Sequence, residues 1–420
     1  MKKFLIFCLL PLSLLLGGCV KKNEPVALMM VVSGNLLGEL EPCGCTLEGD
    51  FGGIKRQASV IEQLRKQDPN LLLVSTGALL DTEAVSANIK NQYILTGFQQ
   101  LNYDAIALQN RDQSFGLSSL RTTALPWLAK NVLADFVATE RKKTIKEISV
   151  SVFSAMQAES QTESLPAALI KKIQQRHQQG VLTILITDQQ PEHLKQTLDF
   201  KNLDILIMPN NDTKFSEPQI FGRTLVVRPG NQGQKLGVLH LMVKQGHIIN
   251  YRQTIQALGK TIPDAPSLKT WYSQYNQALK IFYQARAKIS AELMQKPAYV
   301  GAETCGTCHS KALEKWHSSL HSQALLALKR VNKQFDPECV SCHVVGYGQA
   351  GGFVDEFLTP QFANVQCESC HGSGVEHVKA PALNKMADLK RRHPPVCVAC
   401  HNEKHSPVFN FDQYWPRVAH

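Results

Sequence analysis

Cysteine and histidine are concentrated at one end of this 420-residue chain. Ten of its 14 histidines and eight of its 12 cysteines lie between Cys305 and His420. The eight cysteines form four Cys-x-x-Cys-His motifs, each with two thiols three positions apart and an imidazole directly after them. The motif residues are Cys305, Cys308 and His309; Cys339, Cys342 and His343; Cys367, Cys370 and His371; and Cys397, Cys400 and His401.

This spacing is typical of covalent attachment of c-type haem. Two thiols on one helical turn can bond the two vinyl groups on one edge of a porphyrin. The histidine that follows then lies beneath the ring and gives its imidazole to the iron. The motifs predict four haem groups, with His309, His343, His371 and His401 as proximal iron ligands.

Zinc is the alternative occupant of such motifs. Structural zinc sites pair two Cys-x-x-Cys knuckles that are typically about 15–20 residues apart. Here 29, 23 and 25 residues separate successive motifs, and each motif has its own histidine. Disulfides within the motifs would leave those histidines unexplained, so haem is favoured over both.

The second axial ligands must come from histidines outside the motifs. His321 lies twelve positions beyond His309 in a stretch, 311–330, whose pattern predicts a helix. On a helix that separation is about 18 Å, too far to reach back to the same iron, so His321 would serve a neighbouring haem. So short a region cannot wrap four haems separately, and we expect the haems themselves to form its core. The candidate histidines are His317, His321, His377, His393, His405 and His420.

From Tyr299 to His420 the sequence resembles the tetrahaem cytochrome c554 group. The resemblance is carried by Trp316 and His321 after the first motif, by Glu338 to Gln349 around the second, by Gly372 and His377 after the third, and by Phe411-Asp412 with His420 at the end. It implies that His321 is the distal ligand of the fourth haem, His377 of the first and His420 of the third. It also implies that the haem on His343 is five-coordinate with an open face. His317, His393 and His405 match no ligand, and we expect them at the surface, although one of them could close the second haem.

The N-terminus has the pattern of an export signal. Lys2 and Lys3 precede a short apolar stretch, 4–16, which is too short to span a bilayer. Leu16-Gly17-Gly18-Cys19 resembles a bacterial lipobox, in which Cys19 becomes the acylated first residue of the mature chain. A plain secretory signal is the alternative. We therefore expect a signal peptide over 1–18, a lipidated tether over 19–25, and a lipoprotein at the periplasm or outer membrane of a Gram-negative envelope.

Residues 26–262 alternate buried-strand and amphipathic-helix patterns, which predicts an α/β domain. The strands are expected over 27–32, 70–75, 105–108, 181–187, 204–208, 224–228 and 237–243, and two helices over 53–66 and 86–101. The turns after these strands resemble those of calcineurin-like metallophosphoesterases of the 5'-nucleotidase branch, which implies a metallophosphoesterase-like sandwich.

The metal ligands of that family are replaced in this chain. Its Asp-x-His becomes Asn35-x-Leu37, the Asp of Gly-Asp becomes Ala78, and the His of Gly-Asn-His becomes Arg111. A further ligand histidine falls at Asp188, and the closing Gly-His-x-His becomes Pro209-Asn210-Asn211-Asp212. Two-metal hydrolysis needs a clamp of nitrogen and oxygen ligands around both ions. We therefore expect neither phosphatase nor nucleotidase activity, and interpret this domain as a pseudophosphatase that acts as a docking body.

Cys43 and Cys45 lie just beyond the first of these turns. Paired thiols close to haems suggest a redox-active pair, with an incidental structural pair as the alternative.

A linker helix is expected from Ser267 to about Gln295, within residues 263–296, because its apolar residues recur every three or four positions. The remaining residues, 297–420, make up the predicted tetrahaem domain, which is mainly α-helical with a haem core.

Lys and Arg exceed Asp and Glu by 45 to 35, a net charge of +10. Haem propionates would offset most of this charge, so nucleic acid is not an expected partner. The expected function is electron transfer in the cell envelope, with quinol oxidases or reductases or other cytochromes as redox partners and the membrane contacted through the N-terminal lipid. The alternative is a haem enzyme that reduces or oxidises a small nitrogen compound at the open haem on His343.

Overall fold

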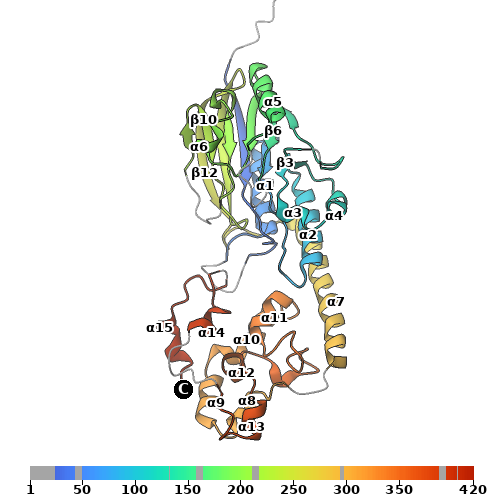
Figure 1. Ribbon diagram of the computed structural model, residues 1–420, viewed down its shortest axis with the longest axis vertical. Coiled ribbons are helices and arrows are strands. Elements are labelled where there is room, and N and C mark those ends of the chain that lie inside the picture. The colour runs from blue at the N-terminus through green and yellow to red at the C-terminus, as the bar shows by residue number, and fades with distance from the viewer. Residues whose placement is uncertain are drawn as a thin grey trace, which may run out of the picture.

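The computed structural model describes residues 24–42, 50–131, 133–157, 164–210, 217–293, 298–386, 394–403 and 405–420. Two six-stranded mixed sheets make up its N-terminal part, which is called the sandwich below (Figure 1). The first sheet has the order β12-β11-β1-β2-β3-β4 and the second β5-β6-β7-β8-β10-β9. The strands are β1 Val26–Ser33, β2 Leu72–Ser75, β3 Ala105–Ala107, β4 Trp127–Leu128, β5 Arg141–Ile145, β6 Ile148–Ser154, β7 Leu182–Ile186, β8 Ile205–Ile207, β9 Gln219–Phe221, β10 Thr224–Val227, β11 Lys235–Lys244 and β12 His247–Ala257.

The period of two along β1 explains how the sheets stack. Leu28, Met30 and Val32 lie in the apolar layer between the two sheets, whereas Met29 and Val31 lie in the layer beneath the helices. Both faces of β1 are buried, as is usual for parallel strands covered on each side. The resulting arrangement has helices on the outside of both sheets, and the predicted α/β sandwich is confirmed.

Helices α1 (Ile54–Gln67) and α2 (Ala87–Leu101) share the apolar layer on the outer face of the first sheet. Helix α5 (Ala167–Gln178) lies against the second sheet through Leu169 and Ile173. The sandwich also has the short elements α3 Asn110–Gln113, α4 Leu117–Arg121, α6 Pro191–Leu194 and η1 Phe200–Asn202.

Helix α7 (Lys269–Leu293), preceded by η2 (Pro266–Leu268), leaves the sandwich and runs beside the remaining part of the chain (Figure 1). Trp271 packs against Gly97 of α2, where an added Cβ would meet the indole at 2.8 Å. Its Nε1 donates to the Tyr93 carbonyl at 3.1 Å. The glycine therefore lets the two helices approach closely, and α7 begins within two residues of the start predicted from its apolar periodicity.

The C-terminal region, the described residues from 298 to 420, consists of short helices (Figure 1). The expected single helix over 311–330 is wrong. The chain forms α9, turns at Ser318 and Ser319, passes through η3 and continues as α10, because the two serine hydroxyls donate back to the carbonyls of Lys315 and Trp316. The elements are α8 Ala302–Gly306, α9 Ser310–His317, η3 Leu320–Gln323, α10 Ala324–Arg330, α11 Pro337–His343, η4 Pro360–Phe362, α12 Cys367–His371, α13 Val375–Lys379, α14 Pro394–Val398, α15 Phe411–Tyr414 and η5 Trp415–Arg417.

Candidate functional site

Each Cys-x-x-Cys-His motif lies on a helical turn or directly continues one. The second motif is in α11 and the third makes up α12, while the first and fourth begin in α8 and α14. In the first, the His309 N–H donates to the Cys305 carbonyl at 2.9 Å, and in the fourth the His401 N–H donates to that of Cys397 at 2.8 Å. These helical bonds put the two cysteines of a motif one turn apart, as attachment to a single porphyrin edge requires.

Three motif histidines each face a histidine from a distant part of the sequence. The ring centroids of His309 and His377 are 6.2 Å apart, those of His321 and His401 6.1 Å, and those of His371 and His420 5.9 Å. With metal–nitrogen bonds of about 2 Å and about 1 Å from nitrogen to ring centre, two imidazoles on opposite sides of one iron have centroids about 6 Å apart. The three separations fit a bis-histidine iron site.

Backbone carbonyls orient several of these rings. The Nδ1 of His377 contacts the Asn384 carbonyl at 2.8 Å, and that of His420 contacts the Val418 carbonyl at 2.9 Å. His343 Nδ1 likewise contacts the Ala324 carbonyl at 2.7 Å. A carbonyl can only accept, so Nδ1 carries the proton in each ring and Nε2 keeps its lone pair for a metal.

His343 has a different environment. Among the residues that the structure describes, no second imidazole is paired with His343 as the other three motif rings are paired. Burial lowers the pKa of His343, the Ala324 carbonyl opposes that shift, and the nearby His405 adds to it. His405 is therefore a neighbour of this ring. His317 is exposed and contacts Glu303 at 3.5 Å, and His393 lies outside the described residues.

The cysteines of different motifs also lie together. The Cys305 and Cys367 thiols lie close enough that each shifts the other's pKa, and the same holds for Cys342 and Cys400. The first motif is thus beside the third, and the second is beside the fourth. Cys370 and Cys397 are close enough to interact electrostatically, which brings the third motif near the fourth. The order of the motifs in space is first, third, fourth, second.

Buried polar side chains hold the first and third motifs in this relation. The Glu368 carboxylate accepts N–H bonds from Val300, Gly301 and Gly374 at 2.7–3.1 Å. Next to it, Gln366 Oε1 accepts the Ala302 N–H at 2.7 Å. These bonds tie the start of α8 to α12, so the residue inside the third motif also positions the first.

The buried apolar residues of the C-terminal region all lie between Ala302 and Phe362, so the rest of that region has little apolar core. No apolar side chain among its described residues beyond Phe362 is buried, whereas Phe357 is 92% exposed and Leu383 85% exposed. So small a core could not offset the conformational entropy of ordering the chain. A large apolar group in contact with these residues would supply the missing core, and haem fits both this requirement and the donor set of thiols and imidazoles.

At the sandwich, the turns that correspond to a two-metal centre are closed by internal hydrogen bonds. Asn35 Oδ1 accepts from Thr76 Oγ1 at 2.7 Å and from Gln109 Nε2 at 2.9 Å. Leu37 and Ala78 keep left-handed backbones, with φ of 56° and 46°, and the Leu37 N–H donates to the Ala78 carbonyl at 2.7 Å. The polar groups of these turns thus bond within the protein.

The Asp112 carboxylate accepts hydrogen bonds from the N–H groups of the second turn. It accepts from Ala78 at 3.0 Å, from Leu79 at 2.7 Å, from Leu80 at 3.3 Å and from Gln109 at 3.2 Å. It is fully buried.

Two other positions at which the resembling family has metal ligands also bond within the protein. Arg111 Nε donates to the Leu80 carbonyl at 2.7 Å, and Asp188 accepts the Gln157 N–H at 3.1 Å. No three metal-ligating side chains converge at the described residues of these turns. Asn211 and Asp212 lie outside the described residues.

Two lysines, one from each part, join the sandwich to the C-terminal region. Lys90 of α2 contacts Asp81 at 2.8 Å and Glu338 of α11 at 2.8 Å, with 7% of its side chain exposed. Lys333 contacts Glu41, which also accepts from the Tyr272 hydroxyl of α7. The second motif, which begins one residue after Glu338, therefore lies at the contact with the sandwich.

Several expectations concern residues outside the described ranges, namely Cys19, Cys43 and Cys45. In the described part of the chain no helix has both the length and the apolar character to cross a bilayer.

One cluster has no counterpart in the sequence predictions. His177, Asp204 and His247 converge in the sandwich, with ligand atoms within 4.8 Å of one another. They are far apart along the chain and belong to no local motif, which explains why no sequence pattern pointed to them.

Comparison with known proteins agrees with both halves of this description. The family model for cytochrome c554 and c-prime matches residues 304–372. Cytochrome c-554 of Nitrosomonas europaea is 35% identical over 91 residues, which are 18% of this chain and only 39% of that protein. Haem, redox chemistry and redox partners are thus properties of the matched C-terminal family.

The sandwich resembles solved phosphoesterases. A sulfate thiohydrolase SoxB of Thermus thermophilus superposes with a TM-score of 0.51 at 12% identity, covering 65% of this chain and 62% of that one. A 5'-nucleotidase precursor, also of Thermus thermophilus, superposes with a TM-score of 0.52 at 15% identity, covering 73% and 68%. At these identities the likeness concerns the fold alone. The chain thus joins a C-terminal segment that matches the cytochrome c554 family model to a sandwich with the fold of 5'-nucleotidase-like phosphoesterases.

Proposed function

We propose that this protein is a tetrahaem electron carrier of the cell envelope, with one c-type haem on each Cys-x-x-Cys-His motif. The observation that carries the proposal is the set of three imidazole pairs with centroids 5.9–6.2 Å apart. Each pair joins a motif histidine to the distal histidine that the c554 resemblance implies. Bound haem supplies reversible one-electron chemistry between the ferric and ferrous states.

The protein's own residues would fix coordination and spacing. The eight motif cysteines form thioethers, His309, His343, His371 and His401 are proximal ligands, and His377, His420 and His321 are distal ligands to the first, third and fourth irons. Carbonyl bonds to Nδ1 of the rings support this role, because they leave Nε2 available. The adjacent thiols of the first and third motifs, and of the second and fourth, support close edge-to-edge spacing along the order first, third, fourth, second.

A haem count tests the proposal directly. We expect four haems per polypeptide from pyridine haemochrome absorbance against amino-acid analysis, and four haem additions in the intact mass. Replacing Cys339 and Cys342 by serine should reduce the count to three. A chain with no tetrapyrrole, or with zinc in the motifs, would contradict the proposal.

A second candidate function is favoured by the environment of His343. Its ring is not paired in the way that the other three motif rings are, and Nδ1 is bonded to a carbonyl, which leaves Nε2 for the iron. For the position to be open, the neighbouring His405 must stay off the iron. An open coordination position there would let a small nitrogen compound bind to the iron. Electron paramagnetic resonance distinguishes the two functions. One high-spin ferric haem in four, together with turnover of nitric oxide, nitrite or hydroxylamine, would favour the enzyme, whereas four low-spin haems without turnover would favour the carrier.

We propose that the sandwich, within residues 26–262, is a non-catalytic docking body. The support is that Asn35, Ala78 and Arg111 use their polar groups within the protein, and that Asp112 occupies the N–H groups of the second turn. A 5'-nucleotide and a generic phosphate ester, each with added manganese, test this: we expect no hydrolysis above the rate of the metal alone.

The chain would be divided into a signal peptide over 1–18, a tether over 19–25, the sandwich, a linker helix within 263–296 and the tetrahaem domain over 297–420. Acylation of Cys19 would hold the protein at the periplasmic face of a membrane or at the outer membrane, with quinol oxidases or reductases or other cytochromes as partners. Cys43 and Cys45 would form a redox pair. Palmitate labelling of the native chain, lost in a Cys19→Ala variant, tests the lipid anchor.

A further inference from the structure

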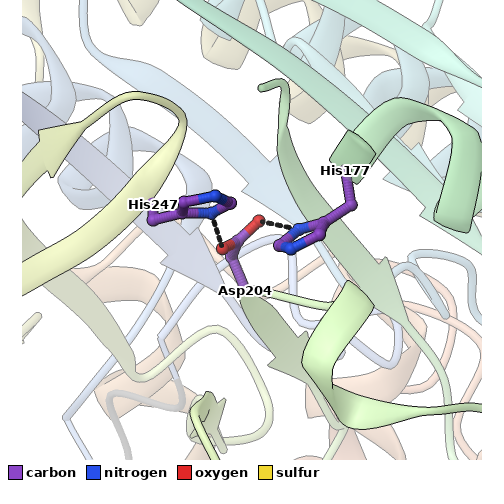
Figure 2. A group of neighbouring side chains, drawn as sticks. All are labelled: His177, Asp204 and His247. Atoms are coloured by element: carbon purple, nitrogen blue, oxygen red, sulfur yellow. Dashed lines mark hydrogen bonds and ion pairs between the residues drawn. The ribbon is translucent and has the colours of Figure 1, made fainter. Parts of the chain in front are cut away.

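Three side chains from separate parts of the sandwich meet at His177, Asp204 and His247 (Figure 2). His177 is in the last turn of α5, Asp204 directly precedes β8, and His247 is the first residue of β12. Figure 2 draws the Asp204 carboxylate between the two imidazole rings. The ring centroids are 4.5 Å apart and the planes are tilted by 41°.

The distances suit a small cation. Nδ1 of His177 is 3.5 Å from Asp204 Oδ2, and Nδ1 of His247 is 3.3 Å from Asp204 Oδ1. Ligand atoms at about 2.0–2.1 Å from a tetrahedral zinc ion are about 3.3 Å from one another. All three ligand atoms lie within 4.8 Å of one another, so small side-chain rotations bring them onto one ion.

Because its side chains are buried, the cluster destabilises the folded chain when no cation is bound. The side chain of Asp204 is 2% exposed and that of His177 is 10% exposed. Nδ1 of His177 is buried, and its contact with the Asp204 carboxylate, at 3.5 Å, is too long for a good hydrogen bond. An ion between the rings would replace this long contact with a ligand bond, which a buried nitrogen needs more than an exposed one does.

Other contacts hold the ligands in place. Asp204 Oδ2 accepts from both the N–H and the hydroxyl of Thr183, each at 2.9 Å. The loop after His177 and the turn before His247 meet backbone to backbone, because Gly246 adopts φ +81° and a Cβ there would lie 2.1 Å from the Gly180 carbonyl oxygen. The carboxylate and both histidine-bearing segments are therefore preorganised.

The cluster lies away from the degenerate metal turns. Those turns follow the carboxyl ends of β1, β2 and β3. Asp204 instead lies at the amino end of β8, at the opposite end of the strands. It also joins the two sheets, since β12 belongs to the first and β8 to the second. A bound ion would fasten the sheets together at that edge.

We propose that His177, Asp204 and His247 bind a zinc ion, with a water molecule as the fourth ligand. Two imidazole nitrogens and one carboxylate favour zinc over magnesium or calcium, which prefer oxygen ligands. Arg223 is the cation that acts on His177, and it is exposed, so that salt and water screen its repulsion of the ion.

Zinc binding is tested on the haem-loaded full chain after dialysis against a chelator and then against zinc chloride. Elemental analysis reports zinc and iron separately, so a loss of haem is not mistaken for a loss of zinc. We expect one zinc ion per chain, and none in a His247→Gln or a His177→Gln variant. His240→Gln is the matched control, because His240 is an exposed histidine on the adjoining strand β11.

Two further readouts do not depend on the variants' folding. Zinc K-edge absorption should report two imidazoles and an oxygen at about 2.0 Å. Zinc at a hundredfold excess over its dissociation constant should raise the midpoint of thermal unfolding by roughly 5–10 °C. Equal zinc content in wild type and His247→Gln, or an absorption spectrum without two imidazoles, would overturn the proposal and identify a histidine–aspartate–histidine ion triad. Neither result bears on the haem count, so electron transfer is tested separately.

Discussion

The Lys90 ammonium is the group on which the contact between the sandwich and the C-terminal region depends most. It lies at 2.8 Å from Asp81 and at 2.8 and 2.9 Å from the two oxygens of Glu338. We consider the substitution Lys90→Met, which keeps the apolar stem in α2 and removes the charge. Two carboxylates then remain close together without a counter-ion.

The expected loss follows from burial. The side chains of Lys90 and Asp81 are 7% and 10% exposed, and removal of one partner from a buried ion pair costs about 3–5 kcal/mol. The Glu338 side chain is 30% exposed, so water compensates part of its share. We therefore expect a destabilisation near the lower limit, about 3 kcal/mol, which corresponds to a fall of roughly 5–10 °C in the unfolding midpoint.

Urea unfolding of the haem-loaded chain measures this loss. Circular dichroism at 222 nm follows all helices and the Soret band follows the C-terminal region, so a loosened contact separates the two transitions. Lys379→Met is the control, because Lys379 pairs with Glu376 at 2.6 Å with 64% of its side chain exposed. Such surface pairs contribute up to about 1 kcal/mol.

The double variant Lys90→Met/Glu338→Gln completes a mutant cycle. If the two residues are coupled across the contact, the double variant should be more stable than the sum of the single losses predicts. A Lys90→Met variant no less stable than the Lys379→Met control, with coincident transitions, would refute the reasoning.

Four other outcomes are expected. Burial alone would raise the pKa of Asp81, but the neighbouring ammonium lowers it to about 2 from 3.8; the stability that this carboxylate contributes is therefore present above pH 4 and lost as the pH falls towards 2, which acid titration of the unfolding midpoint checks. Asp112→Ala should cost about 3 kcal/mol in urea unfolding because four N–H groups, three of them buried, lose their acceptor, whereas asparagine, which keeps one oxygen, should cost less. His377→Ala should convert one low-spin haem to high spin without changing the haem count, and an unchanged resonance spectrum would argue against its role as a ligand. Serine at both Cys43 and Cys45 should slow electron exchange with a redox partner in stopped-flow measurements while haem content stays the same; equal rates would exclude a redox role.

Local patterns in the sequence were enough to identify the motif cysteines and to predict most strands of the sandwich and the start of α7. The period-two alternation in β1 and the apolar spacing of α7 are signals that arise within one element. The strands β4, β5, β6, β9 and β12 were missing from the expectation. In β12 the reason is physical: it is an edge strand whose residues are mostly exposed, so an apolar stripe is absent.

Features that depend on distant residues could not be found in the same way. Lys90 and Glu338 are ordinary charged residues in their own segments, and only the folded chain makes them partners. The same holds for His177, Asp204 and His247. The break between α9 and α10 contains neither glycine nor proline, since two serine hydroxyls compete for helix carbonyls instead. The ring pairs could be anticipated only through the c554 resemblance, because nothing local matches one imidazole with another.

The pairing of His309 with His377, His321 with His401 and His371 with His420 has a consequence for biogenesis. Every pair links positions dozens of residues apart, and the pairs interleave along the chain. A polypeptide that crosses a membrane from its amino end therefore exposes the first thiols well before their ring partners emerge, and contacts of such long range close slowly. The delay leaves the first cysteine pair open to the attachment machinery until His377 emerges, and the third pair open until His420 does.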